Sequence, residues 1–228
     1  MSDLRLAVFD MDGTLMDSQD FIVRAMEGAF SAFDLPSPGR PAILSIVGLS
    51  LYEAVARLIP DHPEDLIARV AEAYKACFIA QRAESGGEAS APLYPGAKDA
   101  LEALFARQDV TLGVATGKAR RGLDHACAAH DLDRFFTTRQ TADHHPSKPH
   151  PSMVLSCLSE TGVDPSRAVM IGDTTFDIEM GRAAGVRTLG VTWGYHAAND
   201  LKAAGADLLV DGFADVPAAL DDLWGRTG

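Results

Sequence analysis

Cysteine, basic side chains and long apolar runs are scarce in this sequence of 228 residues. Its three cysteines, Cys77, Cys127 and Cys157, lie far apart without C-x-x-C spacing, which favours buried, reduced thiols in a cytoplasmic protein. Its 20 basic residues against 32 acidic ones give a formal net charge of -12, which argues against nucleic acid or an anionic membrane as a partner. No apolar run approaches the roughly 20 residues that span a bilayer, and the first residues do not resemble a signal peptide.

A hydrophobic content of 47% is nonetheless enough for a packed core, and the length suits one large domain or one domain with an insert. The nearly continuous apolar run at 4–9 is typical of a strand buried on both faces of a parallel sheet. Asp10 and Asp12 follow it directly, and Gly13 comes next. The strand period points both carboxylates out of the carboxyl end of the sheet, where α/β proteins bind ligands. Because neighbouring acids repel each other, we expect a divalent cation beside them.

The rest of the chain divides into two patterns. Residues 18–92 favour helices without a convincing strand, over about 18–30, 43–47, 51–58 and 63–82, and end in a linker at 85–92. From residue 93 onward, strand candidates at 110–115, 135–138, 168–171, 186–191 and 207–210 alternate with helix candidates at 100–107, 119–130, 153–161, 176–184 and 216–224. This alternation predicts an α/β fold, a doubly wound parallel sheet with an inserted helical segment.

Polar side chains stand at four strand ends or loops of this pattern. They are Asp10 and Asp12, then Thr116 and Gly117, then Lys148, and finally Asp173 and Asp177. Taken singly, each has a structural explanation, because an aspartate at a strand end is commonly a helix cap, a loop lysine is commonly solvated and Thr-Gly is a common turn. Their ordered combination is far more specific than any one of them.

The run Asp10-Met11-Asp12-Gly13-Thr14-Leu15 resembles the first signature of the haloacid dehalogenase (HAD) superfamily in its phosphatase form. The segments around Thr116, Lys148 and Asp173 resemble the three later signatures, in order, so that the resemblance spans nearly the whole chain. It implies a Rossmann-like core and a Mg²⁺-dependent phosphatase that works through an aspartyl-phosphate.

The resemblance also assigns roles to these residues. Asp10 is the implied nucleophile, and Asp12 is the implied general acid and base. Magnesium is expected on Asp10, on the backbone carbonyl of Asp12 and on Asp173, with Asp177 as a further direct or outer contact. The substrate phosphate is expected on the Thr116 hydroxyl, on backbone N–H groups at Gly117 and on the ammonium of Lys148.

Comparison with the branches of the superfamily narrows the expected reaction. Haloacid dehalogenases lack the acid at Asp12, and phosphonoacetaldehyde-type hydrolases need a lysine early in the insert, where this chain has only the late Lys75. Phosphomutases of the β-phosphoglucomutase type carry a histidine at the position of Ile22. The remaining resemblance is to the phosphoglycolate-phosphatase-like branch with a helical cap, which the segment at 191–195 also suggests.

In this interpretation, residues 1–17 and 93–228 form the core domain, and residues 18–92 form a cap that closes over the pocket on hinges at 17–18 and 85–92. Arg24, Arg40 and the turn at 48–50 are candidates for substrate selection, although ordinary surface roles are the simpler explanation. The loop around Lys148 contains His144, His145 and His150. We interpret them as part of a polar loop that positions Lys148, rather than as a second metal site. We expect the aromatic side chains of Trp193 and Tyr195 to pack in the fold or to gate the pocket, rather than to stack on a nucleobase.

The sequence therefore predicts a phosphatase for a small phosphorylated metabolite, acting as a monomer or a homodimer. Phosphoglycolate, a sugar phosphate, pyrophosphate and a nucleotide all remain open as substrates. Two alternatives also remain: a phosphomutase, which would return the phosphoryl group to a sugar, and a regulatory protein that keeps the fold without the activity.

Overall fold

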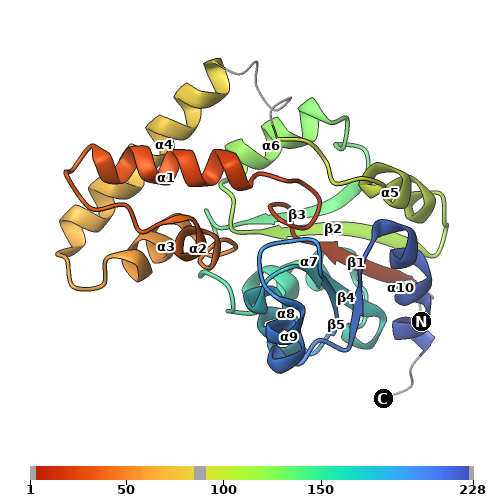
Figure 1. Cartoon of the computed structure of the whole chain (residues 1–228). Coiled ribbons are helices and arrows are strands. Elements are labelled where there is room, and N and C mark those ends of the chain that lie inside the picture. Colours follow the sequence, from red (N-terminus) through yellow and green to blue (C-terminus); the bar gives the residue numbers. More distant parts are fainter. Residues whose placement is uncertain (1–3, 85–90, 226–228) are drawn as a thin grey trace.

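The computed structural model describes residues 4–84 and 91–225. Within these residues a fully parallel, six-stranded sheet has the order β3-β2-β1-β4-β5-β6 (Figure 1). The strands are β1 (Arg5–Phe9), β2 (Val110–Thr116), β3 (Phe136–Thr141), β4 (Ala168–Gly172), β5 (Arg187–Val191) and β6 (Leu208–Val210). Because the strand order reverses at β1, the sheet is doubly wound, which confirms the predicted fold class.

Helices cover both faces of this sheet. α5 (Ala97–Phe105), α6 (Arg120–Ala129) and α10 (Val216–Gly225) pack on one face; α7 (Ser152–Thr161) and α8 (Thr175–Ala183) pack on the other, with α9 (Ala198–Ala204) beside α8. In β1, Ala7 and Phe9 belong to the first apolar layer, whereas Leu6 and Val8 belong to the second. All four side chains are fully buried, which explains why the first strand reads as a continuous apolar run.

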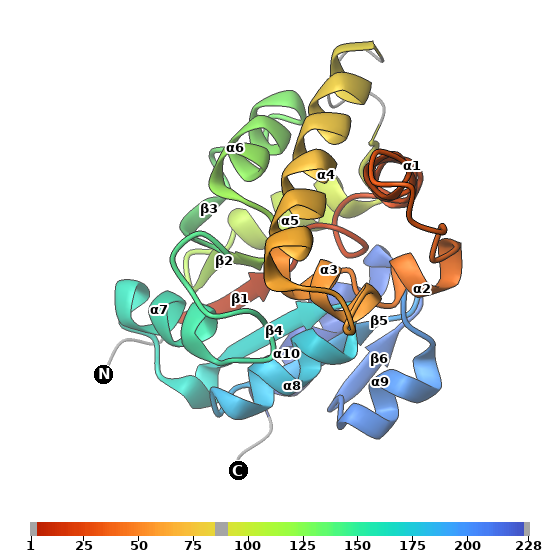
Figure 2. The same ribbon diagram turned by 90° about the vertical axis from the view of Figure 1, so that its left-hand side faces the viewer.

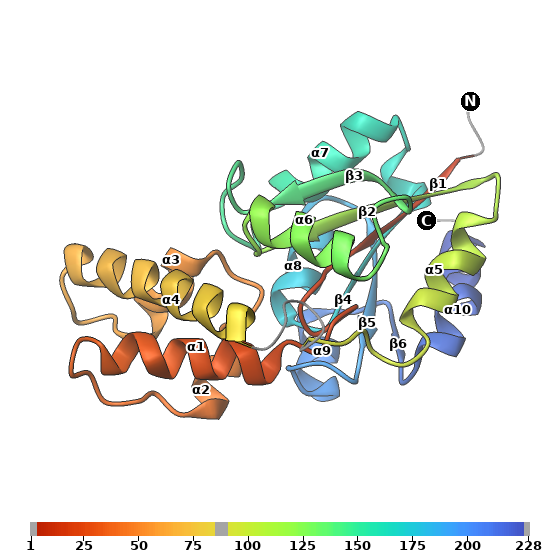
Figure 3. The same ribbon diagram turned by 90° about the horizontal axis from the view of Figure 1, so that it is seen from above.

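Four helices between β1 and α5 carry a buried cluster of their own. They are α1 (Gln19–Ser31), α2 (Arg40–Leu44), α3 (Leu51–Leu58) and α4 (Glu64–Glu84). α1 packs along α4 around Met26, Phe30, Val55 and Val70, and Figure 3 shows the four helices to one side of the sheet. Within the described residues no helix, α4 included, is both long and apolar enough to cross a membrane. Most of the predicted hinge at 85–92 lies outside the described residues.

Three local predictions differ from the structure. β3 runs on to Thr141, beyond the predicted end at 138, because the buried polar residues Thr138 and Gln140 find hydrogen-bond partners there. α9 was not predicted, because Leu201 is its one buried residue and gives no apolar period. α2 begins at Arg40 with a proline in its first turn, whereas the sequence predicted a helix from residue 43.

Candidate active site

The register of the sheet brings separate chain segments to one edge. Phe9 of β1 pairs with Val114 of β2 on one side and with Ile171 of β4 on the other. The residues that end or follow these strands, which include Asp10, Thr116 and Asp173, therefore emerge at the same carboxyl edge. The loop after β3 carries Lys148 to this place, and Asp177 joins it from the first turn of α8.

Lys148 lies at the centre of this group and is 1% exposed. Its Nζ is 2.9 Å from Asp10 Oδ1 and 2.6 Å from Asp177 Oδ1. Burial by itself would lower the pKa of this lysine, but the two carboxylates outweigh burial and raise it. The ammonium is therefore a permanent positive charge inside the protein, and the alternative of a solvated loop lysine does not apply.

Asp10 is a buried carboxylate without aligned hydrogen bonds within the described part of the chain. Neither of its carboxylate oxygens accepts an aligned hydrogen bond from the described residues, although the Lys148 ammonium is close by. Burial raises the pKa of Asp10 to about 7; Lys148 opposes this rise and the nearby Asp177 adds to it. A carboxylate that is held at the end of a strand and uses no oxygen in an aligned hydrogen bond with these residues is available to a ligand, as a nucleophile or a metal ligand must be.

Asp173 is completely buried and its two oxygens are held in fixed directions. The Thr14 hydroxyl donates to Oδ1 at 2.8 Å, and the backbone N–H of Tyr195 donates to Oδ2 at 2.8 Å. A Cβ atom on Gly13 or on Gly194 would collide with this carboxylate, so both positions require glycine. Burial is the main reason that the pKa of Asp173 lies well above its ordinary value, with further contributions from the neighbouring acids.

Asp177 is oriented by the start of α8. Its Oδ2 accepts from the Thr174 backbone N–H at 3.1 Å, and its own backbone N–H donates to the Thr174 hydroxyl oxygen at 3.3 Å, which makes a capping box. Its Oδ1 pairs with Lys148. A Cβ on Gly172 would strike the Asp177 side chain, so this glycine lets the helix approach the strand closely.

Together the three buried acids form a candidate metal centre. One ligand oxygen each from Asp10, Asp173 and Asp177 lies within 4.8 Å of the others. One lysine does not neutralise three carboxylates, and Asp10 Oδ2 has neither a hydrogen bond nor an ion pair among the described residues. This all-oxygen donor set fits a hard divalent cation such as Mg²⁺. The histidine-rich loop serves another purpose, because His145 bonds to Gln140 and Ser152 and so fixes the chain just before Lys148.

Asp12 has a different environment from Asp10, although the two are separated by one residue. Its side chain is 13% exposed, and Lys118 Nζ lies 3.0 Å from its Oδ1. The Ser18 hydroxyl donates to the same oxygen at 2.6 Å. Ser18 is also the N-cap residue of α1. Its side chain makes no capping hydrogen bond, because its hydroxyl donates to Asp12 instead. The side chain of Asp12 is thus held by Ser18 and Lys118 outside the group of three acids, and it lines the pocket.

Thr116 and Gly117 form the turn beside Asp12. The Thr116 hydroxyl oxygen accepts from the Lys118 backbone N–H at 3.3 Å, which leaves the hydroxyl proton available to a ligand. Gly117 lies directly under the turn that joins α2 to α3. A Cβ at this position would be 2.5 Å from the carbonyl oxygens of Gly48 and of Leu49.

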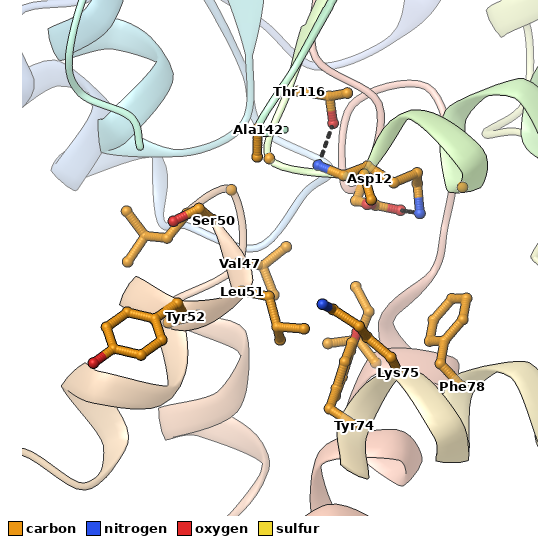
Figure 4. Close-up of a pocket in the computed structure, with 18 of the residues that line it drawn as sticks. Asp12, Val47, Ser50, Leu51, Tyr52, Tyr74, Lys75, Phe78, Thr116 and Ala142 are labelled. Atoms are coloured by element: carbon orange, nitrogen blue, oxygen red, sulfur yellow. Dashed lines mark hydrogen bonds and ion pairs between the residues drawn. The ribbon is translucent and has the colours of Figure 1, made fainter. Parts of the chain in front are cut away.

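A cavity of about 770 Å³ opens between this edge and the helical insert. Asp10, Asp12 and Thr116 line its end at the sheet. Figure 4 shows Val47 and Leu51 along one side of the cavity, with Tyr74 and Phe78 of α4 along another. Both α4 and α6, which lie next to each other in Figures 1 and 2, contribute residues to the lining.

The insert contacts the sheet domain through polar bonds around this cavity. The Ser147 hydroxyl accepts from the Ser50 N–H at 2.8 Å, and His196 Nε2 lies 3.2 Å from the Ser45 carbonyl oxygen. The Tyr195 hydroxyl accepts from the Ser18 N–H at 3.3 Å. These bonds hold the insert against the carboxyl edge of the sheet.

Two proposed selectors lie outside the cavity lining. Arg24 is exposed and donates to the carbonyl oxygen of Asp20, its own neighbour in α1. Arg40 pairs with Asp20 and Gln19 on the surface. The turn at 48–50, by contrast, does line the cavity. Trp193 packs on Phe213 with ring centroids 4.6 Å apart, as the packing interpretation predicts.

Sequence reasoning did not assign roles to several residues that shape the site. Lys118 and Ser18 hold Asp12, and Thr14 and the backbone of Tyr195 hold Asp173. The position of Lys118, directly after Thr116-Gly117 at a strand end, was a usable signal. Ser18 gave no such signal, because a serine before a helix is expected to cap it.

Comparison with known proteins supplies the wider context. A family model described as "Haloacid dehalogenase-like hydrolase" matches residues 7–191. The chain is 37% identical over 218 residues to a protein of Dickeya dadantii named "Probable phosphatase IndB", covering 94% of this chain and 92% of that protein. It is 30% identical over 228 residues to a phosphoglycolate phosphatase of Pseudomonas putida, covering 98% of this chain and 82% of that enzyme.

A solved structure extends the likeness to three dimensions. A haloacid dehalogenase-like family hydrolase from Streptococcus pneumoniae superposes with a TM-score of 0.82 at 26% sequence identity. The match covers 96% of this chain and 99% of that chain, so it includes both the sheet and the helical insert.

Proposed function

Since the chain belongs to the haloacid dehalogenase-like hydrolase family, we propose that it is a phosphatase that hydrolyses a small phosphorylated metabolite through an aspartyl-phosphate. The observation that carries the proposal is the environment of Asp10. Its two carboxylate oxygens lack hydrogen bonds, a buried ammonium lies 2.9 Å away, and the cavity begins at its side chain. Buried carboxylate oxygens usually accept hydrogen bonds from the protein, as those of Asp173 do, so the absence of such bonds from the described residues to Asp10 points to a ligand.

In the first step, an Asp10 oxygen attacks phosphorus and forms a new P–O bond while the ester P–O bond breaks. The electron pair of the broken bond leaves with the alcohol oxygen. Asp12, protonated at this stage, gives its proton to that oxygen. Ser18 and Lys118 keep the Asp12 carboxyl group beside the cavity, where the leaving oxygen would lie.

In the second step, Asp12 takes a proton from water while the water oxygen attacks the phosphorus of the aspartyl-phosphate. The P–O bond to Asp10 breaks, inorganic phosphate is released and the carboxylate of Asp10 is restored. The same Asp12 oxygen pair thus serves as acid and then as base.

The phosphate itself needs positive charge and hydrogen-bond donors. Lys148 supplies a charge next to Asp10, while the Thr116 hydroxyl and the Gly117 backbone N–H supply donors at the neighbouring strand end. Asp10, Asp173, Asp177 and the backbone carbonyl of Asp12 would hold Mg²⁺. When bound, this ion would offset the repulsion between the carboxylates and the phosphate.

The helical segment 18–92 acts as a cap in this proposal, closing the cavity against water. The phosphomutase alternative would need an acid or base from the cap where this chain has Ile22, a buried apolar residue that lines the cavity. Measured release of inorganic phosphate, without isomerised sugar phosphate, separates hydrolysis from mutase activity.

The test is phosphate release from p-nitrophenyl phosphate and a panel of phosphorylated metabolites with Mg²⁺. We expect Asp10→Asn to reduce turnover about a thousandfold or more. Its melting temperature should stay within a few degrees or rise, because the substitution removes a buried charge but little volume. Asp61→Asn, on an exposed turn of the insert, is the matched control and should retain activity. Full activity in Asp10→Asn would refute the nucleophile, and a wild-type protein without phosphatase activity would favour the regulatory alternative.

A further inference from the structure

The two ends of the cavity differ sharply in chemistry. At the sheet end the lining is charged or polar, with Asp10, Asp12, Thr116 and Lys118. On the cap side it is mainly apolar, formed by Ile22, Met26, Val47, Leu51, Tyr74 and Phe78. Because the sheet end would receive the phosphate, the apolar walls face the alcohol half of the substrate.

The size of the cavity makes this difference informative. At about 770 Å³, it falls within the range of roughly 300–1,000 Å³ that accommodates drug-sized ligands. A two-carbon alcohol would fill a small part of it and leave water against Leu51 and Phe78. Apolar walls gain affinity only when the ligand itself has apolar surface to place on them.

The cap offers little to a second charged group on the substrate. Among the described cap residues that line the cavity, Lys75 is the single cation. Its side chain is 52% exposed, and its Nζ is already 2.7 Å from Glu72 Oε1. Outside the cap, Lys118 is already paired with Asp12, and Arg121 on α6 is exposed. A carboxylate such as that of phosphoglycolate would therefore lack an unpaired, buried counter-charge in the cavity.

The apolar walls come close to the reacting end. Lys118 Nζ, 3.0 Å from Asp12 Oδ1, also lies 5.5 Å from the centre of the Phe78 ring. Phe78 and Tyr74 form a tilted aromatic pair with centroids 5.8 Å apart, and Leu51 and Val47 face the same space (Figure 4). A flat group a few bonds from the phosphorylated oxygen would meet aromatic and branched side chains on its faces.

On the basis of the phosphatase activity proposed above, we infer that the substrate is a phosphate monoester of an alcohol that carries a planar, apolar-faced ring. The ring is an aryl group or a nucleobase, since both present the same flat surface. It occupies the space between Leu51 and Phe78 while the phosphate lies at Asp10. The alcohol bears no carboxylate, so 2-phosphoglycolate is a poor substrate.

The test compares matched substrates on the wild-type protein with Mg²⁺. One pair is 2-phenylethyl phosphate and ethyl phosphate; the other is uridine 5′-monophosphate and ribose 5-phosphate. Each pair shares the type of leaving oxygen and differs in the ring. We expect kcat/KM to be about 10- to 100-fold higher for the ring-bearing member of at least one pair, since small apolar groups change specificity by such factors. The responding pair identifies the ring as aryl or nucleobase.

Two variants locate the effect. Leu51→Ser should reduce the ratio of kcat/KM within the responding pair to near one, and Phe78→Ala provides a second variant should the first fail to fold. Leu155→Ser is the matched control, because Leu155 is 46% exposed on α7 and outside the cavity. An unchanged ratio in both cavity variants would overturn the inference.

The outcomes separate this inference from the phosphatase itself. Equal kcat/KM values within both pairs, or hexyl phosphate matching 2-phenylethyl phosphate, would leave the phosphatase standing and overturn the ring. A higher kcat/KM for 2-phosphoglycolate than for every ring-bearing ester would also leave the phosphatase standing and overturn the ring. Absence of phosphate release from every ester would overturn both.

Discussion

Asp10 and Asp12 carry the same side chain, yet the protein gives them opposite surroundings. Asp10 is buried, has no aligned hydrogen bond and has a pKa raised to about 7 by burial. Asp12 is partly exposed and receives bonds from Ser18 and Lys118. Different environments for paired carboxylates are how one site provides both a nucleophile and a proton donor. The proposed division of labour can therefore be tested one residue at a time.

Substituting Asp12 with asparagine should separate the two chemical steps. With p-nitrophenyl phosphate the leaving group needs no proton, so Asp12→Asn should still form the aspartyl-phosphate. It should then stall, because no base activates water, and release a burst of about one p-nitrophenolate per enzyme. Stopped-flow absorbance measures the burst. With ethyl phosphate, whose alkoxide needs the proton, the variant should release no burst of ethanol, which a rapid-quench assay of ethanol measures.

Asp99→Asn, on the exposed side of α5, is the matched control and should show steady turnover without a burst. A variant of Asp12 that turns over both esters at the wild-type rate would assign the proton transfers to another group.

At the scale of elements, the sequence predicted the strands and helices that have a clear hydrophobic period. Apolar runs identified the strands, because a parallel strand that is buried on both faces needs apolar residues at nearly every position. The same rule missed the end of β3, where Thr138 and Gln140 are buried but hydrogen-bonded, and it missed α9, which buries Leu201 alone. The strand ends located Asp10, Thr116 and Asp173, but sequence alone could not show that Ser18 turns away from its helix to hold Asp12.

The contact between the turn at 48–50 and Gly117 could not be predicted either, because it joins segments far apart in the chain. It leads to a test of closure. Gly117→Ala would bring a methyl group to 2.5 Å from two backbone carbonyl oxygens, so the turn must move away. Because these atoms belong to the backbone, no side chain can rotate to relieve the clash. We expect kcat/KM to fall at least about tenfold, since displaced closure misplaces the reacting groups.

Gly212→Ala is the matched control for this substitution. A Cβ at Gly212 has no neighbour within 4 Å, and its backbone is extended with a φ of -164°, so alanine fits there. Thermal unfolding of both variants checks that the core remains folded. Equal kcat/KM values for the two variants would mean that the closed contact at Gly117 does not serve catalysis.

At the scale of the whole molecule, charge is the dominant feature. The chain has a net charge of -12, and folding gathers three buried carboxylates, two of which pair with one lysine. The overall field therefore repels an anionic substrate, and attraction has to come from the site itself. A cation bound among Asp10, Asp173 and Asp177 would favour the folded state, in which these acids are together, over the unfolded chain, in which they are apart.

This reasoning predicts that Mg²⁺ raises the melting temperature of the metal-free protein. Binding at a hundredfold excess over Kd adds about 2.7 kcal/mol to the free energy of unfolding. For a chain of this length, that corresponds to an increase of roughly 5–10 °C in differential scanning calorimetry. Asp173→Asn should lose most of the increase, because it removes one of the three carboxylates that would hold the ion, whereas Asp61→Asn should keep it. Potassium chloride at equal ionic strength distinguishes the site from general screening of the acidic surface. An equal increase with potassium, or one that survives in Asp173→Asn, would mean that the buried acids do not hold the ion.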